Sequence, residues 1–414
     1  MKWTTNTPLA TIISCFLFAC APSVSLHKEE LPVPSSGTGP ETFKVLTYNA
    51  WHGLDTGEFW VTATETPDQS EARLQFQAAQ ISAIQPDIVL LQEVNPLPAR
   101  ASQYVQALAD RGLQYDEVHQ VDACGIRLRG ETALIPGLNN GLVILAKHVL
   151  HLRKLIGLKL SGDLGGCDSA SGMQFEELRY AVVGDITIPE SGQHYLVTST
   201  HLHSGIEAGA AFLETLEKAY RAGHLPRFPE FRWEIEQDRL RRIGELDRLT
   251  RTLREFQRQG AYAGFAVGGD FNFESDFPEY EEAVLLRLAD AAHPATGNGE
   301  LYTADPQRNS LIHIVEESTI PASLQRVLKD LPLDFAEKAH EAYGAEIRRP
   351  RRIDYLWVES FLSGYCVRQE LFGTETNAEG FPASDHYGVL TTFSLTDGSC
   401  SMTRASGPEA VQKE

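Results

Sequence analysis

Gly268-Gly269-Asp270-Phe271-Asn272-Phe273 is the stretch from which the organisation of the chain can be worked out. The apolar and partly aromatic run before it, residues 261–267, predicts a buried strand. The two glycines predict a tight turn at the strand end. In an extended segment Asp270 and Asn272 would point to one side, flanked by buried phenylalanines. This pair suits a water molecule or a phosphate oxygen, and an Asx turn that caps the strand is an equally good interpretation.

Other parts of the chain repeat this pattern. Four more stretches end predicted strands in polar side chains of catalytic type, and a fifth opens a strand. They are Thr47-Tyr48-Asn49, Leu91-Gln92-Glu93-Val94, Ser199-Thr200-His201-Leu202-His203, Arg352-Ile353-Asp354-Tyr355 and Ser384-Asp385-His386-Tyr387-Gly388-Val389. Each alone has an ordinary explanation, such as a surface Glu or a structural His. All six in one chain are hard to attribute to chance, and they predict a single catalytic site.

Strands and helices alternate irregularly along the chain. The hydrophobic periodicity predicts a first helix from Ser70, as its cap, to Ile84, a second over 101–111, and mostly helical structure over 207–258, broken near 223–229. Residues 300–350 are expected to form a long insert. Strands are predicted at 43–49, 88–94, 141–145, 179–188, 195–200, 261–267 and 352–358. Hairpin-like strand pairs between helices favour a layered α/β sandwich over a uniform βαβ wheel.

Charge and composition restrict the class of protein. The 414 residues could form one large domain or two medium ones, and their 42% hydrophobic and 22% charged content is that of a globular protein. With 36 Lys and Arg against 56 Asp and Glu, the formal charge of -20 argues against tight nonspecific binding of nucleic acid. A nuclease with a metal-bearing cleft is not excluded. The arginines between 239 and 254 alternate with acids, which favours a solvated, ion-paired helix face over a binding patch.

The N-terminus predicts export. Residues 1–19 form a signal peptide with one basic residue, Lys2, and a short apolar run. Leu17-Phe18-Ala19-Cys20 resembles a bacterial lipoprotein box, so we expect a lipid on Cys20 that attaches the protein to a membrane, the outer membrane in particular. Cleavage after Ala21 is the alternative, and it would give a secreted or periplasmic protein. Residues 20–42 predict a flexible linker and 397–414 a polar tail.

Four cysteines remain after removal of the signal peptide and modification of Cys20. They are Cys124, Cys167, Cys366 and Cys400, an even number in an oxidising compartment. Of the three possible pairings, we favour Cys124 with Cys167 and Cys366 with Cys400. No Cys-x-x-Cys occurs in the sequence, which argues against a zinc cluster.

Taken together, the six stretches resemble the endonuclease/exonuclease/phosphatase superfamily. Its members include deoxyribonuclease-like nucleases, abasic-site endonucleases, inositol polyphosphate phosphatases and neutral sphingomyelinases. The resemblance implies one domain over residues 43–396 with a four-layer α/β sandwich, in which two mixed β-sheets pack face to face with helices outside. It also implies a site at the strand ends on one edge. We expect a monomer.

The resemblance implies a divalent metal ion. Asn49 and Glu93 match the family's metal ligands, and Asp385 matches a further carboxylate near the ion. Carboxylate and amide oxygens suit hard ions, so Mg²⁺ or Mn²⁺ fits better than zinc.

The resemblance also implies roles for five catalytic residues. Asp270 matches the residue that orients and deprotonates the attacking water, and Asn272 would hold the nucleophile or the phosphate through its amide. His386 matches a histidine that faces the phosphate as hydrogen-bond donor or general acid, with Asp354 bonded to its other nitrogen. His201 would stabilise charge that develops on phosphorus.

The substrate is less well defined by the sequence. We expect a metal-dependent phosphodiesterase that acts by activated-water attack, with a phospholipid or sphingomyelin-type substrate ahead of an extracytoplasmic deoxyribonuclease-like activity. A non-catalytic binding lipoprotein is a third possibility. Asn49-Ala50-Trp51 and the His201-Leu202-His203 stretch resemble the sphingomyelinase branch, whereas Trp51-His52-Gly53 departs from its usual Trp-Gly; His203 has no secure counterpart. The run Arg348, Arg349, Arg351 and Arg352 could bind a phosphate or form an ion-paired strand start.

Overall fold

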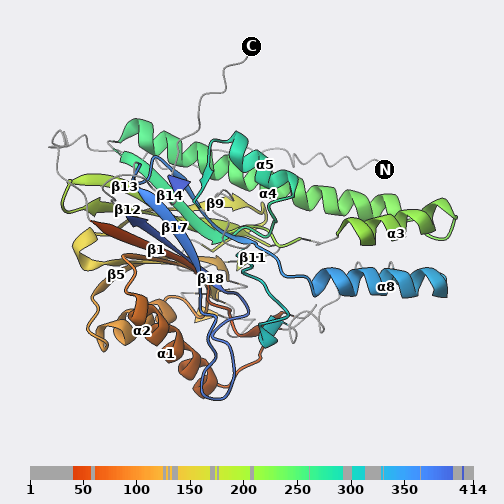
Figure 1. Cartoon of the computed structure of the whole chain (residues 1–414), viewed down its shortest axis with the longest axis horizontal. Coiled ribbons are helices and arrows are strands. Elements are labelled where there is room, and N and C mark those ends of the chain that lie inside the picture. Colours follow the sequence, from red (N-terminus) through yellow and green to blue (C-terminus); the bar gives the residue numbers. More distant parts are fainter. Residues whose placement is uncertain are drawn as a thin grey trace, which may run out of the picture. The chain divides into compact units, whose positions relative to one another are not determined.

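Two mixed β-sheets form the centre of the fold in the computed structural model (Figure 1). It describes residues 41–56, 61–124, 127–128, 131–132, 139–167, 173–174, 177–205, 209–260, 262–291, 301–312, 328–329, 331–363, 365–394 and 403–404. The first sheet has the order β19 (Thr403–Arg404), β17 (Cys366–Phe372), β18 (Gly388–Ser394), β1 (Thr42–Asn49), β4 (Ile88–Val94), β8 (Asn140–Lys147) and β5 (Tyr115–Ala123). The second has the order β15 (Ala289–Asp290), β16 (Asp354–Glu359), β14 (Tyr262–Asp270), β13 (Gln193–His201), β12 (Arg179–Ile188) and β9 (Arg153–Ser161).

Strand direction explains why the sheets are mixed. β1 pairs with β4 in parallel, and so does β13 with β14, while the other pairs within the two sheets are antiparallel. Three two-stranded ribbons complete the described strands: β2 (Leu54–Thr56) with β3 (Val61–Ala63), β6 (Arg127–Leu128) with β7 (Glu131–Thr132), and β10 (Gly165–Gly166) with β11 (Met173–Gln174).

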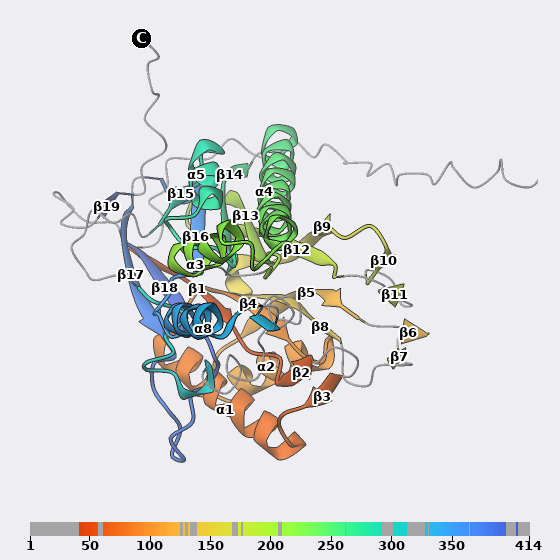
Figure 2. The same ribbon diagram turned by 90° about the vertical axis from the view of Figure 1, so that its right-hand side faces the viewer.

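Helices cover the outer face of each sheet. Figure 2 shows α1 (Pro67–Ile84) and α2 (Ala99–Ala109) on one side, and α4 (Phe228–Gln259) and α5 (Pro278–Leu285) on the other. This arrangement confirms the predicted four-layer sandwich. Alternation along the strands supplies both cores: Val182 and Ile186 of β12 belong to the core between the sheets, and Ala181 and Val183 to the core under α4.

The glycines of the central stretch do not make the turn that we predicted. Gly268 and Gly269 continue β14, which ends at Asp270. A Cβ atom on Gly268 would lie 2.6 Å from Leu90 Cδ1 of the facing sheet, and one on Gly269 would lie 2.0 Å from the Thr200 carbonyl oxygen. The glycines are therefore required because the neighbouring strand β13 and the first sheet approach β14 closely here, and they do not form a turn.

The start of the first helix also differs from the prediction. α1 begins at Pro67, and Thr66 caps it: the Thr66 side chain accepts from the Gln69 N–H, and the Gln69 side chain accepts from the Thr66 N–H. This reciprocal capping box, with proline in the first turn, outcompetes Ser70 as the start signal. The second helix lies two residues earlier than predicted, at Ala99–Ala109.

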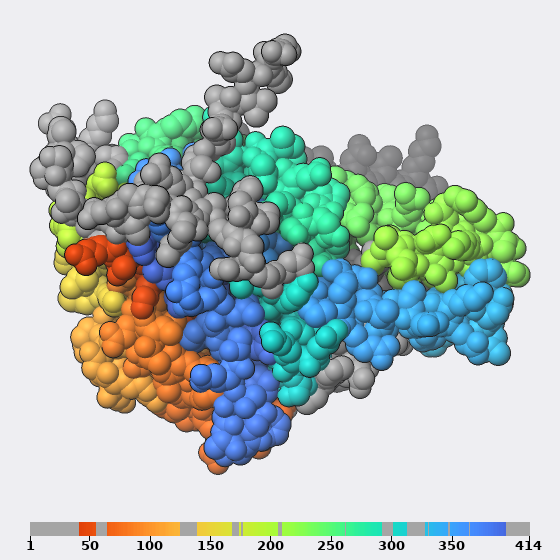
Figure 3. Space-filling view, in the orientation of Figure 1, coloured from red at the N-terminus to blue at the C-terminus, as the bar shows by residue number. Residues whose placement is uncertain are grey.

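The first part of the 207–258 segment and part of the long insert form a helical unit with its own core, while the rest of α4 covers the second sheet. α3 (Ala210–Arg221), the first turns of α4 and α8 (Leu333–Ile347) share a hydrophobic core that includes Phe212, Phe231 and Tyr343. The surfaces of α3 and α8 run side by side in the space-filling view (Figure 3). α3 follows the end of β13, and α8 precedes the start of β16. The helical unit is therefore joined to the sandwich at the end of the second sheet where β13 finishes and β16 begins.

The disulfide prediction is confirmed where it can be examined. Cys124 and Cys167 are bonded, and Cys366 is also in a disulfide, while its expected partner Cys400 lies outside the described residues. The signal peptide, Cys20 and most of the 20–42 linker lie outside them too, and they stay predictions. None of the helices among the described residues combines the length and apolar character needed to cross a membrane.

Candidate active site

Strand register places the predicted residues at one edge of the sandwich. Asn49 and Glu93 lie at the carboxyl ends of the parallel strands β1 and β4, and His201 lies opposite Asp270 at the ends of β13 and β14. Asp354 opens β16 instead of ending a strand as we expected. Because β16 runs antiparallel to β14, Asp354 pairs directly with Asp270, which brings it to the same edge.

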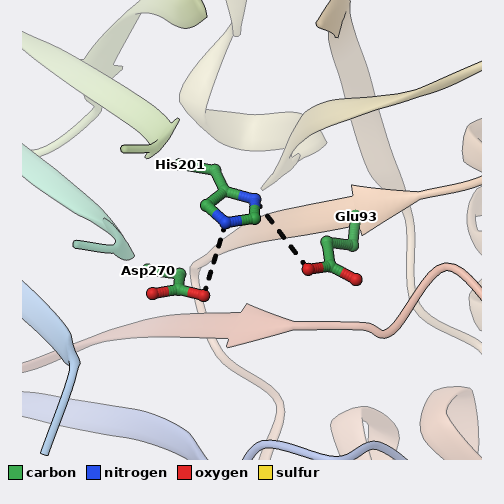
Figure 4. A group of neighbouring side chains, drawn as sticks. All are labelled: Glu93, His201 and Asp270. Atoms are coloured by element: carbon green, nitrogen blue, oxygen red, sulfur yellow. Dashed lines mark ion pairs between the residues drawn. The ribbon is translucent and has the colours of Figure 1, made fainter. Parts of the chain in front are cut away.

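Glu93, His201 and Asp270 converge from both sheets (Figure 4). His201 Nε2 lies 3.5 Å from Asp270 Oδ2, and His201 Nδ1 lies 4.0 Å from Glu93 Oε1. Candidate ligand atoms of the three residues all lie within 4.8 Å of one another. His201 Nδ1 is buried without a hydrogen-bond partner in the described structure. The group therefore has the spacing and the open bonding capacity of a site that binds an ion or substrate.

Asn49 bridges the two carboxylates. Its Nδ2 donates to Glu93 Oε1 at 3.1 Å and to Asp270 Oδ2 at 3.2 Å, and its Oδ1 accepts from the Trp51 N–H. In this orientation the amide presents hydrogens, not its oxygen, to the site. The role of Asn49 as a metal ligand stays a prediction, and the geometry shows it positioning Glu93 and Asp270.

His386 is held by Asp354 as we expected. Its Nδ1 lies 2.9 Å from Asp354 Oδ2, and its Nε2 faces Asp270 Oδ2 at 3.8 Å. The preceding loop is fixed by Ser384, whose Oγ donates to the Asn49 carbonyl and accepts from the His386 N–H. Ser384, which we did not predict as a site residue, thus connects β1 to the histidine.

Asn272 adopts the alternative arrangement that the sequence left open. Its φ of 52° ends the extended backbone, and its N–H donates to Asp270 Oδ1 at 3.0 Å, which forms an Asx turn. Its Nδ2 donates to the Leu202 carbonyl at 3.1 Å, so Asn272 and Asp270 do not extend side by side. Asn272 holds the Asp270 carboxylate and the loop after His201; a contact with nucleophile or phosphate stays a prediction.

Burial and neighbouring charges shift the pKa values of four ionisable groups of the site in different directions. The groups are Asp270, His386, His201 and Glu93. Burial, and then the Asp354 carboxylate, raise the pKa of Asp270 to about 7, which suits a general base. Burial would lower the pKa of His386, but Asp354 and Asp270 outweigh it and hold this pKa well above its usual range. Burial and Arg179 lower the pKa of His201 to about 3, so this histidine is neutral. Burial alone would raise the pKa of Glu93; the adjacent His52 and the hydrogen bond from the Asn49 amide lower this pKa instead.

The residues present fit a divalent ion. The half-buried Glu93 and the buried Asp270 bring two carboxylates close together, and their oxygens are the atoms that Mg²⁺ and Mn²⁺ prefer. Glu93 is the ligand that the geometry supports best. Asp385, a predicted further carboxylate, has its Oδ1 3.1 Å from Ser384 Oγ and is close enough to Glu93 for their charges to interact. An ion held there would supply Lewis-acid stabilisation of a phosphoryl oxygen.

Two buried charged groups beside the site were not predicted. Arg179 at the start of β12 bonds Glu177 and acts electrostatically on His201. Asp122, near the end of β5, is 2% exposed, and burial raises its pKa to about 7. Sequence position alone does not reveal them, because each becomes a neighbour of the site only when β5 and β12 face each other.

His203 takes part in an ion-paired network. Its Nδ1 contacts Glu177, and its Nε2 lies 2.8 Å from Asp238 Oδ1. Its backbone N–H donates to Glu245 of α4 at 2.9 Å. Both ring nitrogens are thus engaged by carboxylates, which favours a role in fixing the loop after His201 over contact with substrate.

Arg242 of α4 also holds this loop, contrary to the prediction of a solvated helix face. It is 2% exposed, and its Nε and Nη2 lie 2.9 Å and 2.7 Å from Glu279 Oε1. Its Nη1 donates to the carbonyls of His203 and Ser204 at 3.3 Å and 3.1 Å. Arg251, on the same helix, does follow the prediction, in an exposed pair with Asp247.

We expect Arg242→Ala to lower the free energy of unfolding by about 3–5 kcal/mol, since it leaves the Glu279 carboxylate buried without its partner. Arg251→Ala is the matched control and should cost under about 1 kcal/mol, because its ion pair is exposed. Urea denaturation of both variants measures the two values. Equal, small losses would show that the Arg242–Glu279 pair does not hold the loop.

The basic run before β16 forms an ion-paired strand start. Arg349 Nη1 bonds Glu274 at 2.6 Å. Both terminal nitrogens of Arg352 bond Asp290 at 2.8 Å, and its guanidinium stacks on Tyr355. These arginines stabilise the edge of the site, and the structure favours this interpretation over phosphate binding.

Comparisons with known proteins found one matching family and several similar solved structures. The sequence model of a family described as the Endonuclease/Exonuclease/phosphatase family matches residues 46–386. No curated protein matches the sequence. An endonuclease/exonuclease/phosphatase family protein from Bacteroides thetaiotaomicron has a TM-score of 0.50 and 15% identity, over 86% of this chain and 96% of that chain. Truncated Caenorhabditis elegans TDP2 has a TM-score of 0.48 and 16% identity, over 86% of this chain and 98% of that chain. D. rerio TDP2 complexed with single strand DNA product has a TM-score of 0.47 and 16% identity, over 86% of this chain and 100% of that chain.

Proposed function

The chain belongs to the Endonuclease/Exonuclease/phosphatase family, and from this premise we propose that it is a divalent-metal-dependent phosphodiesterase. Members of this family are generally metal-dependent phosphoesterases and nucleases. The observation that carries the proposal is the convergence of His201 and His386 on one oxygen of Asp270, at 3.5 Å and 3.8 Å. A carboxylate with a raised pKa, placed between two histidines, can accept a proton from water while the histidines face the phosphate.

The side chains divide the work of hydrolysis. Asp270 orients the attacking water and takes its proton. His386, kept protonated by Asp354, donates a hydrogen bond or a proton to the phosphate or the departing oxygen. His201, neutral, offers a hydrogen bond to the same group. Glu93, with Asp385 as a further carboxylate, would hold Mg²⁺ or Mn²⁺, and the ion would offset the negative charge of the phosphate.

A phospholipid or sphingolipid is the substrate class that we propose first. The chain carries a net charge of -20, and the arginines beside the site, Arg349 and Arg352, are bonded to carboxylates. A long polyanion would gain little from such a surface, whereas a lipid presents one phosphodiester. The lipid on Cys20 that the sequence predicts would keep the enzyme beside such a substrate.

One substrate panel tests the proposal. Purified protein is incubated with sphingomyelin, phosphatidylcholine, plasmid DNA and bis-nitrophenyl phosphate, with chelator, Mg²⁺ or Mn²⁺. We expect hydrolysis that chelator abolishes and either ion restores, with a lipid cleaved fastest. Cleavage of plasmid alone would identify a nuclease instead, and no hydrolysis of any phosphodiester would indicate a binding protein on this fold.

A further inference from the structure

His52 lies next to Glu93 in the loop after β1. This loop carries a histidine between Trp51 and Gly53, and both of these neighbours have positive φ, 58° and 69°. The Leu54 N–H donates to His52 Nδ1 at 3.0 Å. A neutral imidazole that accepts at Nδ1 carries its hydrogen on Nε2. The loop therefore fixes which ring nitrogen can donate.

That donor faces one particular oxygen of Glu93. His52 Nε2 lies 3.6 Å from Glu93 Oε2, and the His52 backbone N–H donates to the same oxygen at 3.2 Å. The other oxygen, Oε1, contacts Asn49 and faces His201. Glu93 itself has a φ of 57°, a conformation that surrounding contacts must maintain. The two carboxylate oxygens thus have different surroundings: Oε2 accepts from the His52 backbone N–H and faces the His52 ring, while Oε1 is turned toward the centre of the site.

We propose that His52 is a positioning residue that holds Glu93 in the orientation needed to bind the divalent ion. The proposal rests on the metal-dependent function above. His52 is not proposed as a ligand, because its Nε2 carries the hydrogen and its Nδ1 is bonded to Leu54. Groups that orient a metal ligand from outside the coordination shell commonly change metal affinity by about 10–100-fold when they are removed.

Metal binding measured without substrate tests this inference. Isothermal titration calorimetry of the whole protein with Mn²⁺ and with Mg²⁺ compares wild type, His52→Ala and His52→Gln. We expect His52→Ala to weaken binding about 10–100-fold. His52→Gln should retain most of the affinity, because a Gln side-chain amide can replace the N–H donor. His119→Ala is the matched control: His119 also neighbours a glutamate, Glu117, at 3.7 Å, but lies on β5, and its loss should leave binding unchanged.

The outcomes separate this inference from the proposed function. Wild-type protein that binds neither ion would overturn the metal-dependent function, and this inference with it. Binding by wild type and His52→Ala with equal affinity would overturn the role of His52 alone. Melting temperatures without metal provide the folding control: if His52→Ala and His52→Gln lose affinity equally and both melt earlier, the histidine stabilises the loop and does not position Glu93.

Discussion

Asp270→Asn is expected to lower the turnover of phosphodiester hydrolysis by about 100-fold or more, the usual scale for loss of acid–base help. The amide keeps the size of the side chain and can still accept from the Asn272 N–H, but it cannot take a proton from water. The measurement is kcat on bis-nitrophenyl phosphate at saturating Mg²⁺. Because Asp270 also borders the predicted metal site, the Kd for Mn²⁺ is measured in parallel. A loss of kcat that persists when the metal site is saturated reports the missing base and not weaker binding of the ion.

His386→Ala should cost a similar factor, since it removes the donor that faces the phosphate. The double variant should lose less than the product of the single losses, because both groups act on one transition state. Asp185→Asn provides the control for loss of a buried carboxylate: Asp185 is 1% exposed and bonds His194 Nδ1 at 3.0 Å, away from the strand ends of the site. If Asp270→Asn and His386→Ala turn over as fast as Asp185→Asn, this edge of the sandwich is not the catalytic site.

The strand ends were predictable because two simple patterns coincide there. An apolar run that ends in a polar side chain marks both the end of the strand and the polar residue placed there, as for Asn49 in β1 and His201 in β13. Such a pattern shows where along the chain these residues lie. Only the resemblance to the superfamily predicts that they meet in one site. The structure then confirms the sandwich and brings Glu93, His201 and Asp270 within 4.8 Å.

Contacts across the fold were not predictable in the same way. Gly268 faces Leu90 of the other sheet, and no local pattern shows that the sheets approach there. Arg242 resembles its exposed neighbours in sequence, yet α5 supplies Glu279 and buries it. His52 did carry a signal, since it interrupts the expected Trp-Gly. The hydrogen bond from Leu54 that fixes its ring depends on the backbone of the loop, which the residue types alone do not define.

Asp354→Asn is expected to move the whole pH profile of kcat to lower pH. The Asp354 carboxylate lies 2.9 Å from His386 Nδ1 and, against the effect of burial, raises the pKa of this histidine well above its usual range. Without that charge the pKa of His386 falls, so the protonated histidine is lost at a lower pH and the basic limb moves down. We expect turnover at the basic end to fall on the order of 100-fold.

The acidic limb should move in the same direction for a separate reason. After burial, Asp354 is the largest cause of the raised pKa of Asp270, because two carboxylates at paired positions of β14 and β16 resist being charged together. With Asn at position 354, Asp270 loses its proton more easily, and the base becomes active at lower pH. A general loss of stability would reduce kcat at all pH values and shift neither limb. Profiles of wild type and variant at saturating Mg²⁺ distinguish the two, and an unchanged or raised basic limb would show that Asp354 does not keep His386 protonated during turnover.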